Sequence, residues 1–152
     1  MNSKTQLKQA LKQKDDSIDG FISDITFVVN ATHEKNRKDN DIISIRDGFL
    51  VARRENPEVV MLQIAPYLWK YRQDIINKNF NKLLNNDYEE EISEITGSLP
   101  EYSNFDKVTS IMQKIKRSWH LFSSAEQNII QTKFIKLISH YATYIGACKA
   151  LQ

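Results

Sequence analysis

Glycine, proline and cysteine are all scarce in this sequence. Its 152 residues include four glycines and three prolines. Folds built from strands and tight turns need many of both, so their scarcity favours helices. The single cysteine, Cys148, excludes an internal disulfide framework and fits a reducing compartment. We therefore expect an all-α protein that resides inside a cell.

Long apolar runs are lacking as well. No stretch approaches the roughly 18 consecutive apolar residues that a membrane-spanning helix needs. The first residues, MNSKTQLKQALKQKDD, contain lysines but no apolar core of a secretory signal. We therefore expect a protein that is not secreted and has no membrane partner. Its length and its apolar fraction of 41% suit one helical domain over residues 1–152.

Motifs that mark common active sites are missing. The sequence has no GxSxG nucleophile elbow, no glycine-rich phosphate loop and no dinucleotide-binding fingerprint. A site built from His120, His140 and Cys148 would require tertiary packing that their spacing does not predict. We expect a protein that is not an enzyme and uses no cofactor.

Apolar residues recur at intervals of three and four along most of the chain, which is typical of amphipathic helices. A proline inside a helix removes one N–H donor, so we expect a kink or a one-turn break at Pro66. The pattern predicts a compact bundle of five to six helices with a central, Pro-containing helix. The expected helices span residues 4–36 (with a break near 16–20), 42–54, 57–76, 80–84, 105–121 and 123 to the C-terminus.

Capping residues indicate where several of these helices begin. Asp41 could cap the second helix. Asn56-Pro57 places a capping side chain before a proline at the first helical position. The stretch SSAEQ at 123–127 is a capping-box start that pairs Ser123 with Glu126 or Ser124 with Gln127. Between the middle and last thirds of the chain we expect an acidic, loop-rich connection over about 87–104.

The stretch DDSIDGFISDIT at 15–26 resembles a calcium-binding loop in its spacing. A loop of the EF-hand kind needs oxygen ligands at positions one, three and five, a glycine at six and a bidentate glutamate at twelve. Position twelve is Thr26 here, and a helix start capped by Asp16 or Ser17 explains the same residues. The candidate ligands of the calcium site are Asp15, Ser17 and Asp19.

Charge is distributed unevenly, although the net charge is only +2. Residues 87–106 contain seven carboxylates and no lysine or arginine, whereas residues 107–152 contain seven basic residues and one acidic residue. A basic region can neutralise nucleic-acid phosphates, or it can be a solvated face. In the nucleic-acid hypothesis the contacting residues are Lys114, Lys116, Arg117, Lys133 and Lys136.

The segment PYLWKYRQDI at 66–75 has apolar residues on two faces of the expected helix. Two such faces indicate either a central core helix or a core face plus an interface with another protein. The acidic run at 87–94 could dock on the basic third of the chain or on a basic partner. We therefore predict a non-catalytic interaction or structural protein that binds a partner or itself through Trp69, Tyr71, Arg72, Tyr88, Glu89, Glu90 and Glu91.

The stretch PEVVMLQIAPYLWKYRQDIINKNFNKLLNNDYEEEI at 57–92 combines an apolar helix containing a proline, a W-K-Y-R run and an L-L-N-x-D-Y acidic element. In this it resembles segments of uncharacterised small helical proteins of large double-stranded DNA viruses of eukaryotes. The resemblance implies an origin and a helical fold. It carries over no functional residues. Separately, we expect a viral accessory or virion protein in the cytoplasm or nucleus of a host cell.

Overall fold

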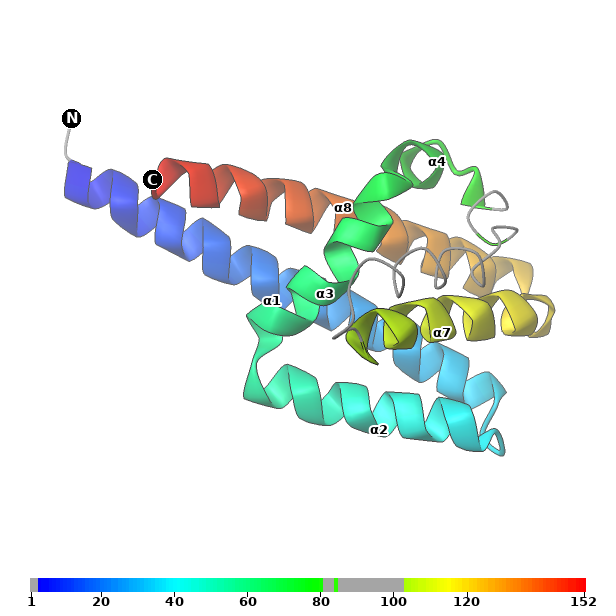
Figure 1. Cartoon of the computed structure of the whole chain (residues 1–152). Helices are drawn as coiled ribbons and strands as arrows, with labels where there is room; N and C mark the ends of the chain where they lie inside the picture. The colour runs from blue at the N-terminus through cyan, green and yellow to red at the C-terminus, as the bar shows by residue number, and fades with distance from the viewer. Residues whose placement is uncertain (1–2, 81–83, 85–102) are drawn as a thin grey trace.

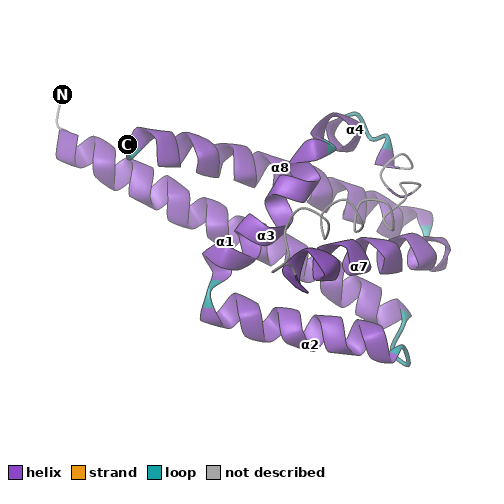
Figure 2. Ribbon diagram, viewed as in Figure 1, coloured by secondary structure: helices purple, strands orange, loops and turns teal. Residues whose placement is uncertain are grey.

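The structure is a computed structural model that describes residues 3–80, 84 and 103–152, with the backbone alone for 103–109. Every regular element in these residues is helical, which confirms the all-α prediction (Figure 2). The helices are α1 (Ser3–Lys35), α2 (Asn40–Glu55), α3 (Pro57–Lys70), α4 (Arg72–Ile76), α7 (Ser103–Ser118), a 3₁₀ turn η1 (Trp119–Leu121) and α8 (Ser124–Ala150).

The two long helices, α1 and α8, form the frame of the bundle. They run antiparallel and side by side (Figure 1), and Lys35 Nζ on α1 lies 3.1 Å from Glu126 Oε2 on α8. On its other side α1 is flanked by α2, whose Arg46 and Arg53 donate to Asn30 and Thr26. The order α8–α1–α2 makes one layer, and α3 and α7 pack across it.

The core lies between this layer and the crossing helices. Helix α3 contacts α1, α2, α7 and α8, and it buries one side while Val59, Leu62 and Pro66 along another side are exposed. Complete burial of large apolar side chains from four helices explains why the elements pack together. The most deeply buried of these are Phe21, Val28, Met61, Leu68, Ile115, Ile130, Phe134 and Leu137.

Two predicted helix features are wrong. Helix α1 has no break near residues 16–20, because Ser17 is buried in mid-helix and its hydroxyl donates to the Gln13 carbonyl at 2.6 Å. Helix α2 begins two residues earlier than expected, and its cap is Asp39, whose side chain accepts from the backbone N–H groups of Asp41 and Ile42. Both errors arise where several polar residues compete for one role.

The expected helix over 57–76 is divided, but at a different residue. Helix α3 continues through Pro66, which is exposed, and ends at Lys70. The chain turns at Tyr71, whose N–H bonds back to the Leu68 carbonyl at 3.0 Å, and α4 then buries Ile75 in the core. A proline on the solvent side costs one backbone hydrogen bond without forcing a helix to end.

The predicted starts of α3 and α8 are confirmed. Asn56 accepts from the Val59 N–H at 3.3 Å, and Pro57 is the first helical residue. Ser123 accepts from the Glu126 N–H at 3.1 Å while the Glu126 carboxylate accepts from the Ser123 N–H at 2.9 Å. Most of the expected helix near 80–84 and of the acidic connection at 87–104 lies outside the described residues. No described helix has both the length and the apolar character that crossing a membrane requires.

Candidate functional site

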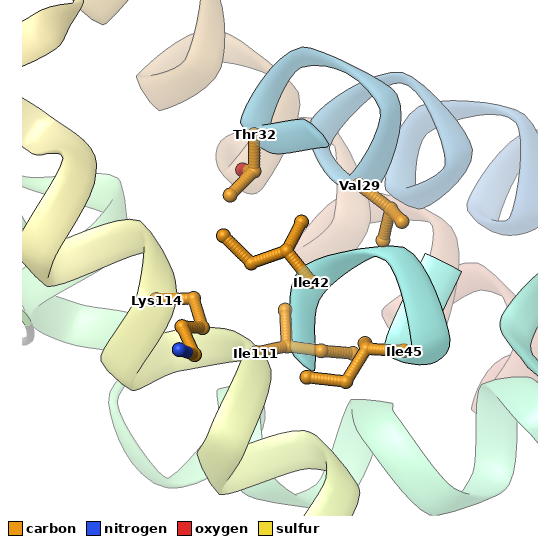
Figure 3. A pocket seen from close by; sticks show the side chains of 6 residues that line it. All are labelled: Val29, Thr32, Ile42, Ile45, Ile111 and Lys114. Atoms are coloured by element: carbon orange, nitrogen blue, oxygen red, sulfur yellow. The ribbon is translucent and has the colours of Figure 1, made fainter. Parts of the chain in front are cut away.

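A small pocket between α1, α2 and α7, whose lining side chains are shown in Figure 3, is too tight to hold a ligand. Its volume is about 10 Å³, at the lower limit for a single water molecule. The Lys114 amine points out of it to Asp39 Oδ2 at 3.1 Å, and the Thr32 hydroxyl donates to the Val28 carbonyl. The gap is a packing defect lined by Val29, Thr32, Ile42, Ile45, Ile111 and Lys114.

The calcium hypothesis is wrong for the described structure. Residues 15–26 all lie in the uninterrupted helix α1, and successive residues of a helix point about 100° apart. Asp15 and Asp19 therefore share the exposed face while Ser17 points into the bundle, so the three side chains cannot converge on one ion. Among the described residues no group of three or more His, Cys, Asp or Glu side chains is placed to hold a metal.

A buried carboxylate joins the two frame helices. Asp24 on α1, with its side chain 10% exposed, lies 3.2 Å from Lys133 Nζ and 3.0 Å from His140 Nε2, both on α8. The ring of His140 rests on Gly20, one turn before Asp24. The sequence contains a signal for this cluster, because Asp24 interrupts an apolar stripe between Phe21 and Ile25. We did not predict the cluster from the sequence.

The five basic residues of the nucleic-acid hypothesis do not form one patch. Lys114 is 3.1 Å from Asp39 and 3.6 Å from Asp41, and Lys133 is held by Asp24. Each of these two lysines therefore joins two helices through an ion pair. Lys116, Arg117 and Lys136 are exposed. Arg117 lines a hollow beside α2, whereas Lys136 lines a different one between α1 and α8.

The aromatic cluster near Trp69 makes its contacts within the chain. The Trp69 ring meets the Tyr141 ring edge-on with centroids 5.5 Å apart, and the Arg72 guanidinium lies 4.9 Å from the Trp69 centroid. Tyr71 packs on Tyr67 with centroids 5.4 Å apart. These contacts join α3 to α8 and α4 to α3. The other predicted partner residues, Tyr88, Glu89, Glu90 and Glu91, lie outside the described residues.

Two open hollows lie on either side of α1 where Ser23 is exposed. The hollow toward α8 has a volume of about 310 Å³ and the one toward α2 and α3 about 470 Å³. Each combines hydroxyl groups with basic side chains. The first is lined by Gly20, Ser23, Asp24, Lys136, Ser139 and His140. The second is lined by Asp19, Ile22, Ser23, Thr26, Arg53, Arg54 and Pro57.

Helices α1 and α8 extend past α3 (Figure 1), and α1 has two exposed leucines near its start. Leu7 is 45% exposed and Leu11 49% exposed. Helix α3 begins about one turn from Leu11. Its Glu58 carboxylate lies 3.4 Å from Lys14 Nζ and accepts from the Tyr144 hydroxyl at 2.7 Å. We call these two leucines, together with the exposed Val59 and Leu62 near the start of α3, the apolar end; the α3 members are 44% and 41% exposed.

No protein-family model matches the sequence, and no curated protein or solved structure is detectably similar to it.

Proposed function

We propose that this protein is a non-catalytic binding protein whose apolar end docks an amphipathic, acidic helix of another protein. The observation that supports this proposal is the continuity of one apolar stripe along α1. Ile18, Ile22 and Ile25 on this stripe are buried. Leu11 and Leu7 extend the same stripe about two and three turns before Ile18, past the point where α3 covers it, and are exposed.

Burial of these leucines supplies a driving force for docking. A leucine side chain moved from water into an apolar contact contributes about 1.5–3 kcal/mol when it starts fully exposed, so the half-exposed Leu7 and Leu11 contribute about 1 kcal/mol each. A helix is the occupant that fits a stripe with a spacing of four residues, because its own apolar side chains recur at three and four.

The charge around the apolar end selects an acidic partner. Residues 3–14 and 141–152 contain five lysines and no aspartate or glutamate, and Glu58 of α3 pairs with one of these lysines, Lys14. Lys8, Lys12 and Lys149 are exposed, although Lys12 also lies 3.0 Å from the exposed Asp16. Complementary charge favours encounter with acidic surfaces and disfavours like-charged ones. The same charge opposes the approach of a second copy through this end.

The test uses labelled helical peptides in fluorescence anisotropy. One peptide has leucines at helical spacing flanked by glutamates, and a second has lysines in place of those glutamates. We expect the native protein to prefer the acidic peptide. We expect Leu7→Gln with Leu11→Gln to weaken its binding about tenfold or more, since about 2 kcal/mol of apolar contact is lost.

Val51→Gln is the matched control, because Val51 is 51% exposed and lies on α2, which contributes no residue to the apolar end. It should leave peptide affinity unchanged. The proposal fails if the native protein binds neither peptide or if the double leucine variant binds as the native protein does. Equal binding of both peptides would refute the acidic partner. Self-association in ultracentrifugation that the leucine variant abolishes would assign the surface to a second copy.

An accessory or virion role in an infected cell stays a prediction. The hypothesis of nucleic-acid binding through the last two helices has less support than the docking proposal, because Lys114 and Lys133 are engaged by Asp39 and Asp24.

A further inference from the structure

The face of α1 opposite the core has basic residues along both of its borders. Helix α2 supplies Arg53, whose Nη1 donates to Thr26 Oγ1 at 3.0 Å, and the exposed Arg54. Helix α8 supplies the exposed Lys136 and, one turn from it, the Lys133–His140 pair at Asp24. The two hollows beside Ser23 lie between these borders and α1. An anionic chain that crosses α1 at Ser23 would meet a basic side chain on each side.

The carboxylates of this face offset only part of its positive charge. Asp24 is already satisfied by Lys133 and His140, so it does not neutralise Lys136. Arg53 is bonded to the Thr26 hydroxyl, which is uncharged. Among the residues that line the second hollow, Asp19 is acidic whereas Arg53 and Arg54 are both basic. The exposed Ser23 and Ser139 provide further hydroxyl partners for phosphate oxygens.

An aromatic ring completes the arrangement. Phe27 lies one turn after Ser23 on the exposed side of α1 and is 42% exposed. Lys133 Nζ lies 4.9 Å from the centroid of its ring. An exposed aromatic beside cations is the combination on which proteins stack unpaired bases while they hold the backbone electrostatically. Packing in the core does not explain why a phenylalanine occupies this position, since much of its ring is exposed to solvent.

We infer that this face, formed by Ser23, Phe27, Arg53, Arg54 and Lys136, binds single-stranded nucleic acid. The backbone crosses α1 at Ser23 with phosphates in the two hollows, and a base stacks on Phe27. Paired bases are not available for stacking on a side chain, so a single strand is favoured over a duplex. The inference is independent of the docking proposal, because none of these residues belongs to the apolar end.

The experiment is fluorescence anisotropy with a labelled oligothymidine of about 20 nucleotides and a duplex of the same length, with added salt from about 50 to 200 mM. We expect the native protein to prefer the single strand. Arg54→Ala with Lys136→Ala should weaken binding at low salt about tenfold and reduce the salt slope by roughly 1.4, because each lost phosphate contact removes about 0.7. Phe27→Ala should weaken single-strand binding about fivefold or more and leave duplex binding unchanged.

Lys116→Ala with Arg117→Ala is the matched control, since it removes two exposed positive charges from α7. It should leave affinity and salt slope unchanged, as should the double leucine variant of the apolar end. If the α7 variant weakened nucleic-acid binding equally, the effect would be explained by net charge alone, and the inference would be overturned. The inference also fails if the native protein does not bind at low salt, or if it prefers the duplex and Phe27→Ala has no effect. Thermal melting confirms that each variant is folded.

Discussion

Gly20 on α1 lies against the ring of His140 on α8. A Cβ atom at this residue would lie 2.5 Å from Cε1 and 2.8 Å from Nδ1 of His140. The ring cannot move away freely, because its Nε2 is bonded to the Asp24 carboxylate at 3.0 Å. A glycine inside a 33-residue helix is therefore explained by the partner helix, although helix propensity alone disfavours it.

Gly20→Ala should lower the free energy of unfolding by about 1 kcal/mol. Overpacking costs about 1–3 kcal/mol, and the higher helix propensity of alanine recovers about 1 kcal/mol of it. Urea denaturation followed by circular dichroism measures the difference. The Asp24–His140 contact should be disturbed at the same time, which the histidine ring signals in an NMR spectrum would report.

Gly48→Ala serves as the control, because a Cβ there meets nothing within 4 Å. It should raise the free energy of unfolding by up to about 1 kcal/mol. In a His140→Ala background the effect of Gly20→Ala should change sign and become stabilising, since the obstructing ring is gone. A stabilising Gly20→Ala in the native background would show that the ring does not constrain this position.

At the scale of the element, local capping chemistry determines where α8 begins. Ser123 and Glu126 form both bonds of a capping box. Ser123→Ala should therefore destabilise the protein by about 1 kcal/mol, lowering the melting temperature by about 2–4 °C for a chain of this size. Ser124→Ala is the control: Ser124 is the first helical residue and is exposed. Equal losses in the two variants would contradict the capping assignment.

Elements were predictable where one local signal dominates. Asn56-Pro57 and Ser123–Glu126 each define a helix start without help from the rest of the chain. The signals at residues 15–20 and 39–41 are ambiguous, because several aspartates and serines can each act as a cap. Packing of Ser17 and Ile18 against the bundle keeps α1 continuous there, since burial outweighs a local tendency to cap.

At the scale of the whole molecule, Glu58 connects three helices. Its carboxylate on α3 accepts from the Tyr144 hydroxyl of α8 at 2.7 Å and lies 3.4 Å from Lys14 of α1. The Tyr144 hydrogen bond is the main reason that the pKa of Glu58 is lowered, with Lys14 contributing and partial burial opposing it. Burial, and then the bond to Glu58, raise the pKa of Tyr144.

These two shifts predict a loss of stability at both ends of the pH range. The Glu58 contribution is present above its ordinary pKa of 4.5 and is lost as the pH falls through the lower value of the folded state. The Tyr144 contribution is present below the ordinary tyrosine pKa of 10.0 and is lost as the pH rises above it. Tyr144→Phe should reduce both dependences and cost about 1 kcal/mol at neutral pH.

Urea denaturation of the native protein and the Tyr144→Phe variant across the pH range tests this prediction. The free energies of unfolding of the two proteins should converge at acid and at alkaline pH. A constant difference at every pH would mean that the Tyr144–Glu58 bond does not couple to protonation.

The candidate surfaces were less predictable than the helices. The sequence supplied the cations, the exposed ring and the leucines, but their surroundings involve residues far apart in the chain. Asp24 meets Lys133 and His140 across 109 and 116 positions, and Lys114 meets Asp39 across 75. Helical spacing places a residue on a face of its own helix, and it contains no information on which neighbour that face will meet.

The sequence by itself determined the helical class, most helix positions and two capped starts, because propensity, periodicity and capping act within a few residues. Only the tertiary structure decided which charged side chains form ion pairs between helices and which remain available to ligands. It also decided that the α1 stripe is buried at Ile18 and exposed at Leu11. The physical reason is that burial depends on where α3 crosses α1, and that crossing is set by the packing of the whole bundle.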